Sequence, residues 1–378
     1  MKIILLGAGL VGSAMAVDLS KDKKFDVTAA DINGTNLEKL KGFFVNGIKA
    51  DLSNLQNVKD LVKDYDLVLN AVPGFLGFDT LKTVIEAGKN AVDIAFYAED
   101  PFLLDKAAKD KNVTVIVDCG VSPGLSNMLI GYADSKLDKT ESVIIYAGGL
   151  PRKKEGLFEY KCVFSITDVI EEYIRPVRYV ENGKQVVKPA LSECELIDFP
   201  GVGTLEAFNS DGLRTIATTI NAIDMKEKTL RYPGHVDKMK ILREAGFFSK
   251  DQIDLGDKKV IPFNLSAKLL AKAFEFKEGD EDLTVLKVIV EGSKNGKKVR
   301  YVFGLLDTYD KKNKTHSMAR TTGYMATMSI RMLADGLYKE KGISPPEFIG
   351  KNEDCFKYIL KGLEERGINI KESLRESD

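Results

Sequence analysis

A glycine-rich turn near the N-terminus is the first segment whose spacing suits chemistry. Residues 7–12 match the pattern G-x-G-x-x-G, directly after the apolar run Lys2–Leu6 and before a segment of helical period. In this pattern one glycine makes a tight turn, one lets the backbone approach a pyrophosphate, and one lets a helix pack closely on a strand. The turn therefore predicts a dinucleotide site. The cofactor-binding residues predicted here are Gly7, Gly9, Leu10, Val11 and Gly12.

An acidic residue follows the second apolar run, as this kind of site requires. Asp31 comes directly after Asp26–Ala30. A carboxylate there can accept hydrogen bonds from the adenosine ribose, and its charge repels the 2′-phosphate that distinguishes NADP from NAD. The next residues, Ile32-Asn33-Gly34, include no arginine to pair with such a phosphate. We therefore expect the cofactor to be NAD.

Later polar residues also end apolar runs in the first third of the chain. In an open parallel sheet the ligand lies outside the carboxyl ends of the strands. Asp51 could equally cap the turn that enters the next helix. By position, Asp51 and Leu52 are expected near the adenine, Asn70, Ala71, Val72 and Pro73 beside the pyrophosphate or nicotinamide ribose, and Asp93 and Asp118 towards the nicotinamide.

The elements that position these residues follow an alternating pattern. Short apolar runs alternate with helical segments up to residue 118, which predicts an α/β fold with a Rossmann-type doubly wound parallel sheet. Longer, alternating strands follow and predict an inserted α+β domain. The predicted strands are Lys2–Leu6, Asp26–Ala30, Gly47–Ala50, Leu67–Ala71, Asn90–Ile94, Val113–Val117, Glu141–Tyr146, Tyr160–Ile166, Leu283–Gly292 and Lys297–Thr308.

The same rhythm predicts three parts of the chain. Residues 1–125 form the dinucleotide-binding domain, and residues 126–316 form the inserted domain. Residues 317–378 are expected to be mostly helical, with helices beginning near Ser317 and Asn352, and to return to the first domain.

Composition excludes several classes of partner. The formal net charge is −1 and there is no sustained basic stripe, which argues against nucleic acid. No apolar stretch approaches the roughly 20 residues of a membrane span, and the first apolar run is too short for a signal peptide, so we expect a cytoplasmic protein that does not cross a membrane. The four cysteines form no C-x-x-C, so neither a metal site nor a disulfide framework is expected.

Six short motifs together resemble one family of enzymes. They are Asn70-Ala71-Val72-Pro73, Val92-Asp93-Ile94-Ala95-Phe96, the run from Asp118 to Asn127, Asp211-Gly212-Leu213-Arg214-Thr215, the run from Thr229 to His235, and Thr321-Thr322-Gly323-Tyr324. With them the chain resembles the saccharopine dehydrogenase-like superfamily, and within it the NAD-dependent lysine dehydrogenases. The resemblance covers nearly the whole chain.

The resemblance implies both an activity and an assembly. It implies oxidation of L-lysine at the ε-amine to allysine, which cyclises to 1-piperideine-6-carboxylate, with NAD as the oxidant. It also implies that the inserted domain carries substrate and dimer contacts, and hence a homodimer. Two alternatives stay open: a saccharopine or carboxynorspermidine-type enzyme of the same superfamily, and a non-catalytic NAD-sensing module.

Oxidation of an amine requires residues that manage protons. An ammonium with an ordinary pKa near 10.4 must lose its proton before hydride can leave. Asp93 and Asp118, at predicted strand ends, are candidates to receive that proton, although either could be a cap. His235 is a candidate proton shuttle because the ordinary pKa of histidine lies near 6.5, but a structural role is the alternative.

An amino-acid substrate also presents a carboxylate, which a guanidinium binds well. Arg214 and Arg231 lie in the motifs and are candidates, with an ion pair between domains as the alternative. Fungal-type saccharopine reductases resemble the chain around residues 120–124 but carry an acid where Ser122 stands, which disfavours saccharopine. Ser122, Phe96 and Thr322 complete the predicted substrate-binding residues, and Thr322 could instead cap a helix.

Overall fold

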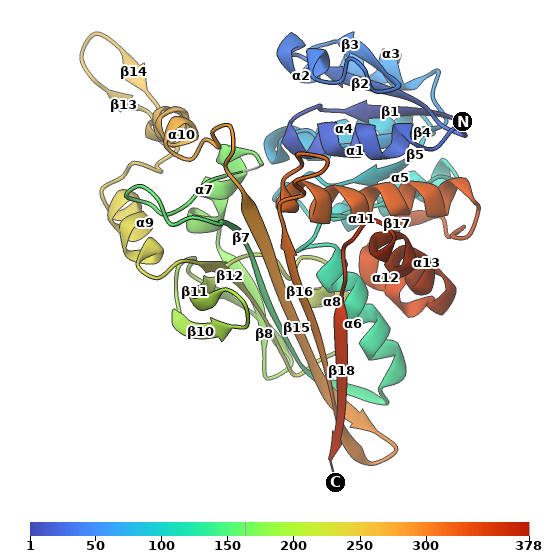
Figure 1. Cartoon of the computed structure of the whole chain (residues 1–378), viewed down its shortest axis with the longest axis vertical. Helices are drawn as coiled ribbons and strands as arrows, with labels where there is room; N and C mark the ends of the chain where they lie inside the picture. The colour runs from blue at the N-terminus through green and yellow to red at the C-terminus, as the bar shows by residue number, and fades with distance from the viewer. Residues whose placement is uncertain (163, 378) are drawn as a thin grey trace. The chain divides into compact units, whose positions relative to one another are not determined.

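The structure is a computed structural model that describes residues 1–162 and 164–377. The chain divides into two compact units. Unit 1 comprises residues 1–138, 218–220 and 318–370, and unit 2 comprises residues 139–217, 221–317 and 371–378. Figure 1 follows the chain by colour from the N-terminus in blue to the C-terminus in red.

Unit 1 is built on a seven-stranded sheet in which all strand pairs are parallel. The strand order is β17-β6-β5-β4-β1-β2-β3, a doubly wound sheet with one additional edge strand. The predicted fold class is thereby confirmed. The strands are β1 (Lys2–Leu6), β2 (Asp26–Asp31), β3 (Val45–Lys49), β4 (Leu67–Asn70), β5 (Asn90–Asp93), β6 (Thr114–Ile116) and β17 (Gly342–Ser344).

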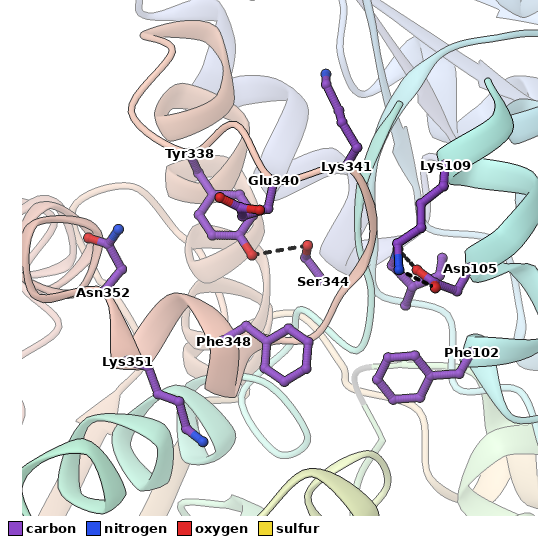
Figure 2. Close-up of a pocket in the computed structure, with 11 residues that line it drawn as sticks. Phe102, Asp105, Lys109, Tyr338, Glu340, Lys341, Ser344, Phe348, Lys351 and Asn352 are labelled. Atoms are coloured by element: carbon purple, nitrogen blue, oxygen red, sulfur yellow. Dashed lines mark hydrogen bonds and ion pairs between the residues drawn. The ribbon is translucent and has the colours of Figure 1, made fainter. Parts of the chain in front are cut away.

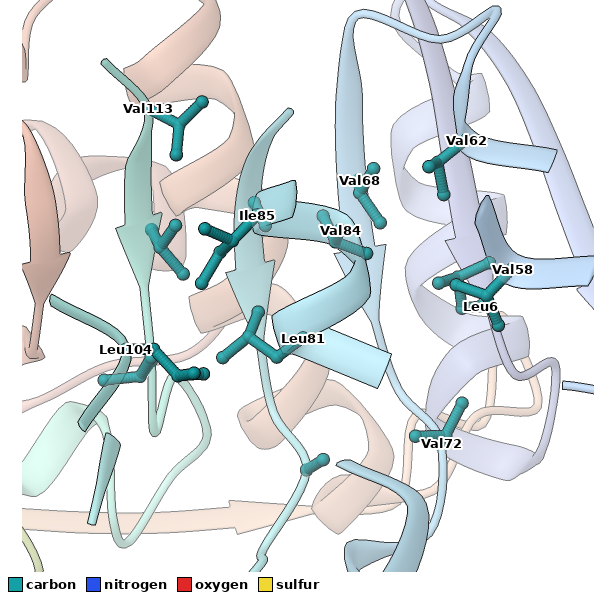
Figure 3. Packing of buried hydrophobic residues seen from close by; sticks show 14 of the residues in the cluster. Leu6, Val58, Val62, Val68, Val72, Leu81, Val84, Ile85, Leu104 and Val113 are labelled. Atoms are coloured by element: carbon teal, nitrogen blue, oxygen red, sulfur yellow. The ribbon is translucent and has the colours of Figure 1, made fainter. Parts of the chain in front are cut away.

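Helices pack on this sheet and bury its apolar strands. In Figure 3, Leu81, Val84 and Ile85 of α4 lie beside strand residues such as Val68, and all of these side chains are buried. Burial on both faces explains why most of the strands are apolar throughout, whereas the edge strand β3 is largely exposed. The helices of unit 1 are α1 (Leu10–Ser20), α2 (Gly34–Glu38), α3 (Leu55–Val62), α4 (Gly74–Glu86), the 3₁₀ turn η1 (Pro101–Leu104), α5 (Asp105–Asp110), α6 (Leu125–Lys136), α11 (Ser317–Ala334), α12 (Pro346–Lys351) and α13 (Glu353–Glu364).

Unit 2 is built on a mixed nine-stranded sheet. Its main path runs β10-β11-β12-β7-β15-β16-β18, and β8 pairs with both β12 and β9. The strands are β7 (Lys139–Pro151), β8 (Val177–Glu181), β9 (Lys184–Lys188), β10 (Glu195–Phe199), β11 (Gly203–Asn209), β12 (Asp224–Arg231), β15 (Asp282–Lys294), β16 (Lys297–Thr308) and β18 (Lys371–Ser377). The other elements of unit 2 are α7 (Ile166–Ile174), α9 (His235–Glu244), α10 (Pro262–Ala273) and a separate pair, β13 (Ile253–Asp254) and β14 (Lys259–Val260). Helix α8 (Ile216–Thr219) begins in unit 2 and ends in unit 1.

One predicted strand of unit 2 is wrong. Residues 160–162 and 164–165 form no strand, Ile166 begins α7, and residue 163 lies outside the described residues. Tyr160 packs its ring edge-on against Phe274, with 5.0 Å between ring centroids. Among the described residues of this segment, Tyr160, Cys162 and Ile166 pack on an aromatic core without forming a strand.

The predicted domain boundaries also differ from the observed units. Helix α6 belongs to unit 1, because a Cβ on its Gly131 would lie 2.1 Å from the carbonyl oxygen of Glu347 in α12, so the two helices touch closely. Strand β18 joins unit 2, where it pairs with β16. The described helices include none that is long and apolar enough to span a membrane.

Candidate functional site

The glycine turn has the geometry that a dinucleotide requires. Gly7 has a φ of +99°, and a Cβ there would lie 2.5 Å from the carbonyl oxygen of Ala71. A Cβ on Gly12 would lie 2.1 Å from the carbonyl oxygen of Gly7. A Cβ on Gly9 would meet no described atom within 4 Å, so the backbone is open at the N-terminus of α1. This open backbone fits the pyrophosphate of a dinucleotide.

Asp31 connects the end of β2 to this turn. Its Oδ2 atom accepts hydrogen bonds from the backbone N–H of Ala8 at 2.7 Å and from Asn36 Nδ2 at 3.3 Å, and its Oδ1 atom accepts one from the N–H of Asn33 at 2.7 Å. A carboxylate has about four acceptor positions, so Asp31 can also accept from a ribose hydroxyl. The structure thus places Asp31 beside the glycine turn, although the sequence did not reveal its contacts with Asn33 and Asn36.

Polar side chains also join the ends of β4 and β5. Asn70 is fully buried, and its Nδ2 atom donates a hydrogen bond to Asp93 Oδ1 at 3.1 Å. The same Asp93 oxygen accepts the N–H of Ala95 at 2.8 Å. The Oδ1 atom of Asn70 is buried and has no hydrogen-bond partner among the described residues. A ligand with a donor group at this edge of the sheet would satisfy that oxygen, whereas Asp93 already anchors the local turn.

The loop after β6 carries the second candidate carboxylate. Asp118 is buried and has a φ of +50°, and the following residue, Cys119, donates its N–H to the carbonyl oxygen of Asp93 at 2.9 Å. A left-handed conformation at a non-glycine residue often marks a functional site. Ser122, four residues on, accepts a hydrogen bond from Ser126 Oγ at 3.2 Å.

Thr322 lies beside this loop within unit 1. A Cβ on Gly120 would lie 3.4 Å from its methyl carbon. Because α11 already begins at Ser317, Thr322 lies inside the helix and does not cap it. Phe96, after β5, is half-buried.

The remaining adenine-side candidates have more ordinary environments. Asp51 is exposed, and its Oδ1 atom accepts hydrogen bonds from the hydroxyl of Ser53 at 2.6 Å and from its N–H at 3.0 Å. These hydrogen bonds lower the pKa of Asp51. They show that Asp51 caps a turn, the alternative that the sequence left open. Leu52 is buried in the hydrophobic core of unit 1. Ala71, Val72 and Pro73 link the end of β4 to the start of α4, where Pro73 is the N-cap residue.

In unit 2, Arg231 is engaged in a buried ion pair. Only 3% of Arg231 is exposed, and its Nη2 atom lies 2.6 Å from Glu172 Oε2. The guanidinium carbon lies 4.4 Å from the ring centroid of Tyr160. Both partners belong to unit 2, so the ion pair predicted as an alternative exists but does not join two domains. The ion pair with Glu172 disfavours the prediction that Arg231 binds the substrate carboxylate.

His235 lies in the same cluster and is buried. Its Nε2 atom is 3.0 Å from the hydroxyl oxygen of Tyr173, and its Nδ1 atom is 3.4 Å from the carbonyl oxygen of Phe158. Burial, with the nearby charge of Arg231, lowers the pKa of His235 to about 3. The imidazole is therefore neutral near pH 7. The prediction of a proton shuttle assumed an ordinary pKa for His235. The sequence gave no sign that this side chain is buried.

Arg214 stands at the end of a loop that begins at Ser210. It is buried and has a φ of +52°. Beside this loop, Glu227 of β12 is also buried, and burial raises its pKa to about 8. Glu227 was not among the residues predicted from the sequence, although an acidic residue in an otherwise buried stretch of strand was a usable signal.

A surface cavity of about 730 Å³ also lies in unit 1, but away from these residues. Its lining comes from η1, α5, β17 and α12 and the loops beside them, and includes none of the predicted site residues. Figure 2 shows that polar groups there pair with each other: Lys109 lies 2.7 Å from Asp105, and Tyr338 donates to Ser344 at 3.0 Å. The cavity is therefore not the dinucleotide site. The described residues also include no cluster of three His, Cys, Asp or Glu side chains placed to hold a metal.

Comparison with known proteins gives one consistent family. Residues 3–116 match the model of the saccharopine dehydrogenase NADP binding domain, and residues 120–368 match that of the saccharopine dehydrogenase C-terminal domain. The first match supports a nicotinamide cofactor on residues 3–116.

Individual relatives are distant in sequence. Mitochondrial alpha-aminoadipic semialdehyde synthase of Bos taurus is 24% identical over 97% of this chain, and the chain spans 47% of that protein. Saccharopine dehydrogenase [NADP(+), L-glutamate-forming] of Pyricularia oryzae is 25% identical over 75% of this chain and 66% of its own length. The solved structure of apo saccharopine dehydrogenase (L-Glu forming) from Saccharomyces cerevisiae superposes with a TM-score of 0.79 at 18% identity, over 99% of both chains, which shows a shared fold.

Proposed function

Because the chain belongs to the saccharopine dehydrogenase family, we propose that it oxidises an amino acid at a carbon bearing an amine, with NAD as the oxidant and L-lysine as the substrate. The product of oxidation at the ε-amine is allysine, which cyclises with its own α-amine. The chain spans less than half of the synthase from Bos taurus, so the activity of that longer protein is not carried over.

The observation that supports the choice of substrate is the pair of arginines in the family-like motifs of unit 2. Both Arg214 and Arg231 are buried, and Arg231 forms an ion pair with Glu172. Lysine has one carboxylate, for which we propose Arg214 as the partner. Saccharopine has three carboxylates and would need more cationic partners than these two arginines.

The choice of NAD rests on Asp31. The matching family model is an NADP binding domain, but in this chain a carboxylate stands at the end of β2, where its charge would face a 2′-phosphate. Ile32 and Asn33 follow and offer no positive charge. These residues support NAD.

In the proposed mechanism the bound cofactor supplies the hydride acceptor. We propose that Arg214 pairs with the α-carboxylate. Asp118 accepts a proton from the ε-ammonium, so that the nitrogen lone pair can form the C=N bond as hydride leaves the ε-carbon. Water then adds to the imine, a proton returns to nitrogen, and ammonia leaves with formation of the aldehyde. Asn70 and Asp93 lie at the carboxyl ends of β4 and β5, the edge of the sheet at which we propose that the cofactor binds.

The test is NADH formation with a panel of amines. We expect lysine to be oxidised with NAD at alkaline pH, where more of its ε-amine is neutral, and saccharopine to react poorly. Ornithine and diamines serve as length controls. Oxidation of saccharopine with a kcat/KM well above that of lysine would establish the alternative activity, which the names of the relatives favour. NAD binding without oxidation of any amine would instead support a non-catalytic NAD-sensing protein.

A further inference from the structure

A buried acid in unit 2 has no role in the mechanism above. Glu227 lies on β12, and only 3% of it is exposed. Its Oε2 atom accepts a hydrogen bond from Ser210 Oγ at 2.5 Å, and Ser210 Oγ lies 2.7 Å from Thr229 Oγ1. The acid is therefore connected to the first residue of the loop that ends at Arg214.

The middle of this loop rests directly on the same acid. A Cβ on Gly212 would lie 2.5 Å from the carboxyl carbon of Glu227, so any larger residue there would displace the Glu227 side chain. On the other side, Asp211 accepts hydrogen bonds from the side chain of Arg178 at 2.9 and 2.6 Å. The loop is thus held between Glu227 and Arg178. Arg214 follows with the left-handed φ of +52°, a conformation that persists only where the surroundings hold it.

The charge of Glu227 decides whether this arrangement is stable. The groups that face its carboxyl are the Ser210 hydroxyl and the Gly212 N–H, which favour ionisation, and the acids Glu172 and Asp211, which oppose it. Tyr179 donates to the backbone carbonyl of Glu227 rather than to its carboxyl. Burial is the largest effect and raises the pKa to about 8, so the acid is mostly neutral at pH 7. Ionisation would add a buried negative charge beside Asp211 and Glu172.

We propose that Glu227, in its neutral form, is a positioning residue that holds the Ser210–Arg214 loop so that Arg214 meets the carboxylate of the substrate. This inference rests on the proposed function. Alkaline pH then has two opposing effects on catalysis. The ε-amine of lysine becomes neutral and reactive, while the ionised Glu227 repels Asp211 in the loop that holds the carboxylate. The effect of Glu227 on catalysis therefore falls on KM rather than on kcat.

The first experiment compares KM and kcat for lysine between pH 7 and pH 10 in three proteins. They are the unmodified protein, Glu227→Gln, in which the amide imitates the neutral acid, and the control Glu244→Gln on the surface of α9. From pH 8 to pH 9.5 we expect the KM of the unmodified protein and of the control to rise roughly tenfold relative to that of Glu227→Gln, with kcat unaffected by the substitution. Parallel KM profiles in all three proteins would overturn the proposal.

A second variant addresses the loop itself. Gly212→Ala places a methyl group against the Glu227 carboxyl, so we expect a raised KM at every pH. A KM equal to that of the unmodified protein would contradict the role of this contact. Melting curves confirm that each variant is folded.

Hydrogen exchange separates this inference from the proposed function. Corrected for intrinsic rates, the amides of residues 210–214 should lose protection above pH 8 in the unmodified protein and keep it in Glu227→Gln. This readout needs no substrate. If no amine is oxidised, the proposed function fails while the exchange data still show whether Glu227 holds the loop. Equal protection in both proteins would overturn the positioning role whether or not lysine reacts.

Discussion

The Oδ2 atom of Asp31 accepts a 2.7 Å hydrogen bond from the backbone N–H of Ala8. The residue expected to face the adenosine ribose therefore also holds the glycine turn expected to face the pyrophosphate. Hydrogen bonds to a charged group contribute about 1.5–3 kcal/mol. The choice between NAD and NADP and the shape of the glycine turn are thus coupled through one carboxylate. A substitution of Asp31 that changes this choice will also lower the affinity for the dinucleotide.

The first prediction concerns this coupling. Asp31→Ser combined with Ile32→Arg should raise the ratio of kcat/KM for NADP to that for NAD by about tenfold or more, because a repelling charge is replaced by an attracting one. The same variant should use NAD less well, since serine does not restore the hydrogen bonds to Ala8 and Asn33. Steady-state kinetics with both cofactors measure this, with Asp31→Ser alone as the control. Equal use of NAD and NADP by the unmodified protein would contradict the assignment.

The second prediction separates the two carboxylates of unit 1. Asp118→Asn should lower kcat by about 10²–10⁴-fold and change the Kd for NAD little, because the amide cannot accept the proton. Asp93→Asn is the matched comparison, and it should mainly lower the melting temperature, since Asp93 anchors Asn70 and Ala95. A kcat for Asp118→Asn within a few-fold of the parent would reduce Asp118 to a structural residue.

The third prediction concerns pH and stability at His235. Its pKa in the folded protein is about 3, below the value near 6.5 expected in the unfolded chain. The unfolded state therefore binds a proton first as the pH falls, and this contribution to stability is fully present above pH 6.5 and is lost between pH 6.5 and pH 3. The loss is at most about 1.4 kcal/mol per pH unit. His235→Gln should show a shallower fall in melting temperature from pH 7 to pH 4.5 than the unmodified protein. Identical slopes for the parent and His235→Gln would refute the buried neutral state.

The fourth prediction concerns the buried ion pair of unit 2. Glu172→Gln leaves the guanidinium of Arg231 buried without its counter-charge, which should destabilise unit 2 by about 3–5 kcal/mol. Chemical unfolding, followed by a probe in unit 2, measures this. Lys41→Gln, which removes an exposed partner of Glu38, is the control and should change stability by less than about 1 kcal/mol. A comparable loss in both variants would show that the buried pair is no stronger than a surface pair.

The fifth prediction tests the proposed carboxylate ligand. Arg214→Lys keeps a positive charge but loses the planar guanidinium, so the KM for lysine should rise by about tenfold or more, with a smaller change in kcat. The diamine cadaverine, which lacks the carboxylate, provides the internal control, because its kcat/KM should be the same in both proteins. An equal loss with lysine and with cadaverine would mean that Arg214 acts through the structure rather than on the carboxylate.

The sequence by itself determined the dinucleotide-binding half of this protein. Glycine spacing, apolar runs and the acid after the second strand are local signals, and all six strands predicted before residue 118 are present. Local periodicity could not reveal β17, because three residues are too few to show a pattern. It also misassigned the segment from Tyr160 to Ile166, where contacts with α10 and the loop after it, far along the chain, decide the conformation.

Only the tertiary structure decided the chemistry of the candidate residues in unit 2. The sequence shows that His235 and Arg231 are present, but not that Tyr173 and Glu172 bury and engage them. Glu227 draws its raised pKa from burial and from acids on a different helix and loop. Ionisation depends on desolvation and on charges brought together from distant parts of the chain, and a linear sequence shows neither until the chain is folded.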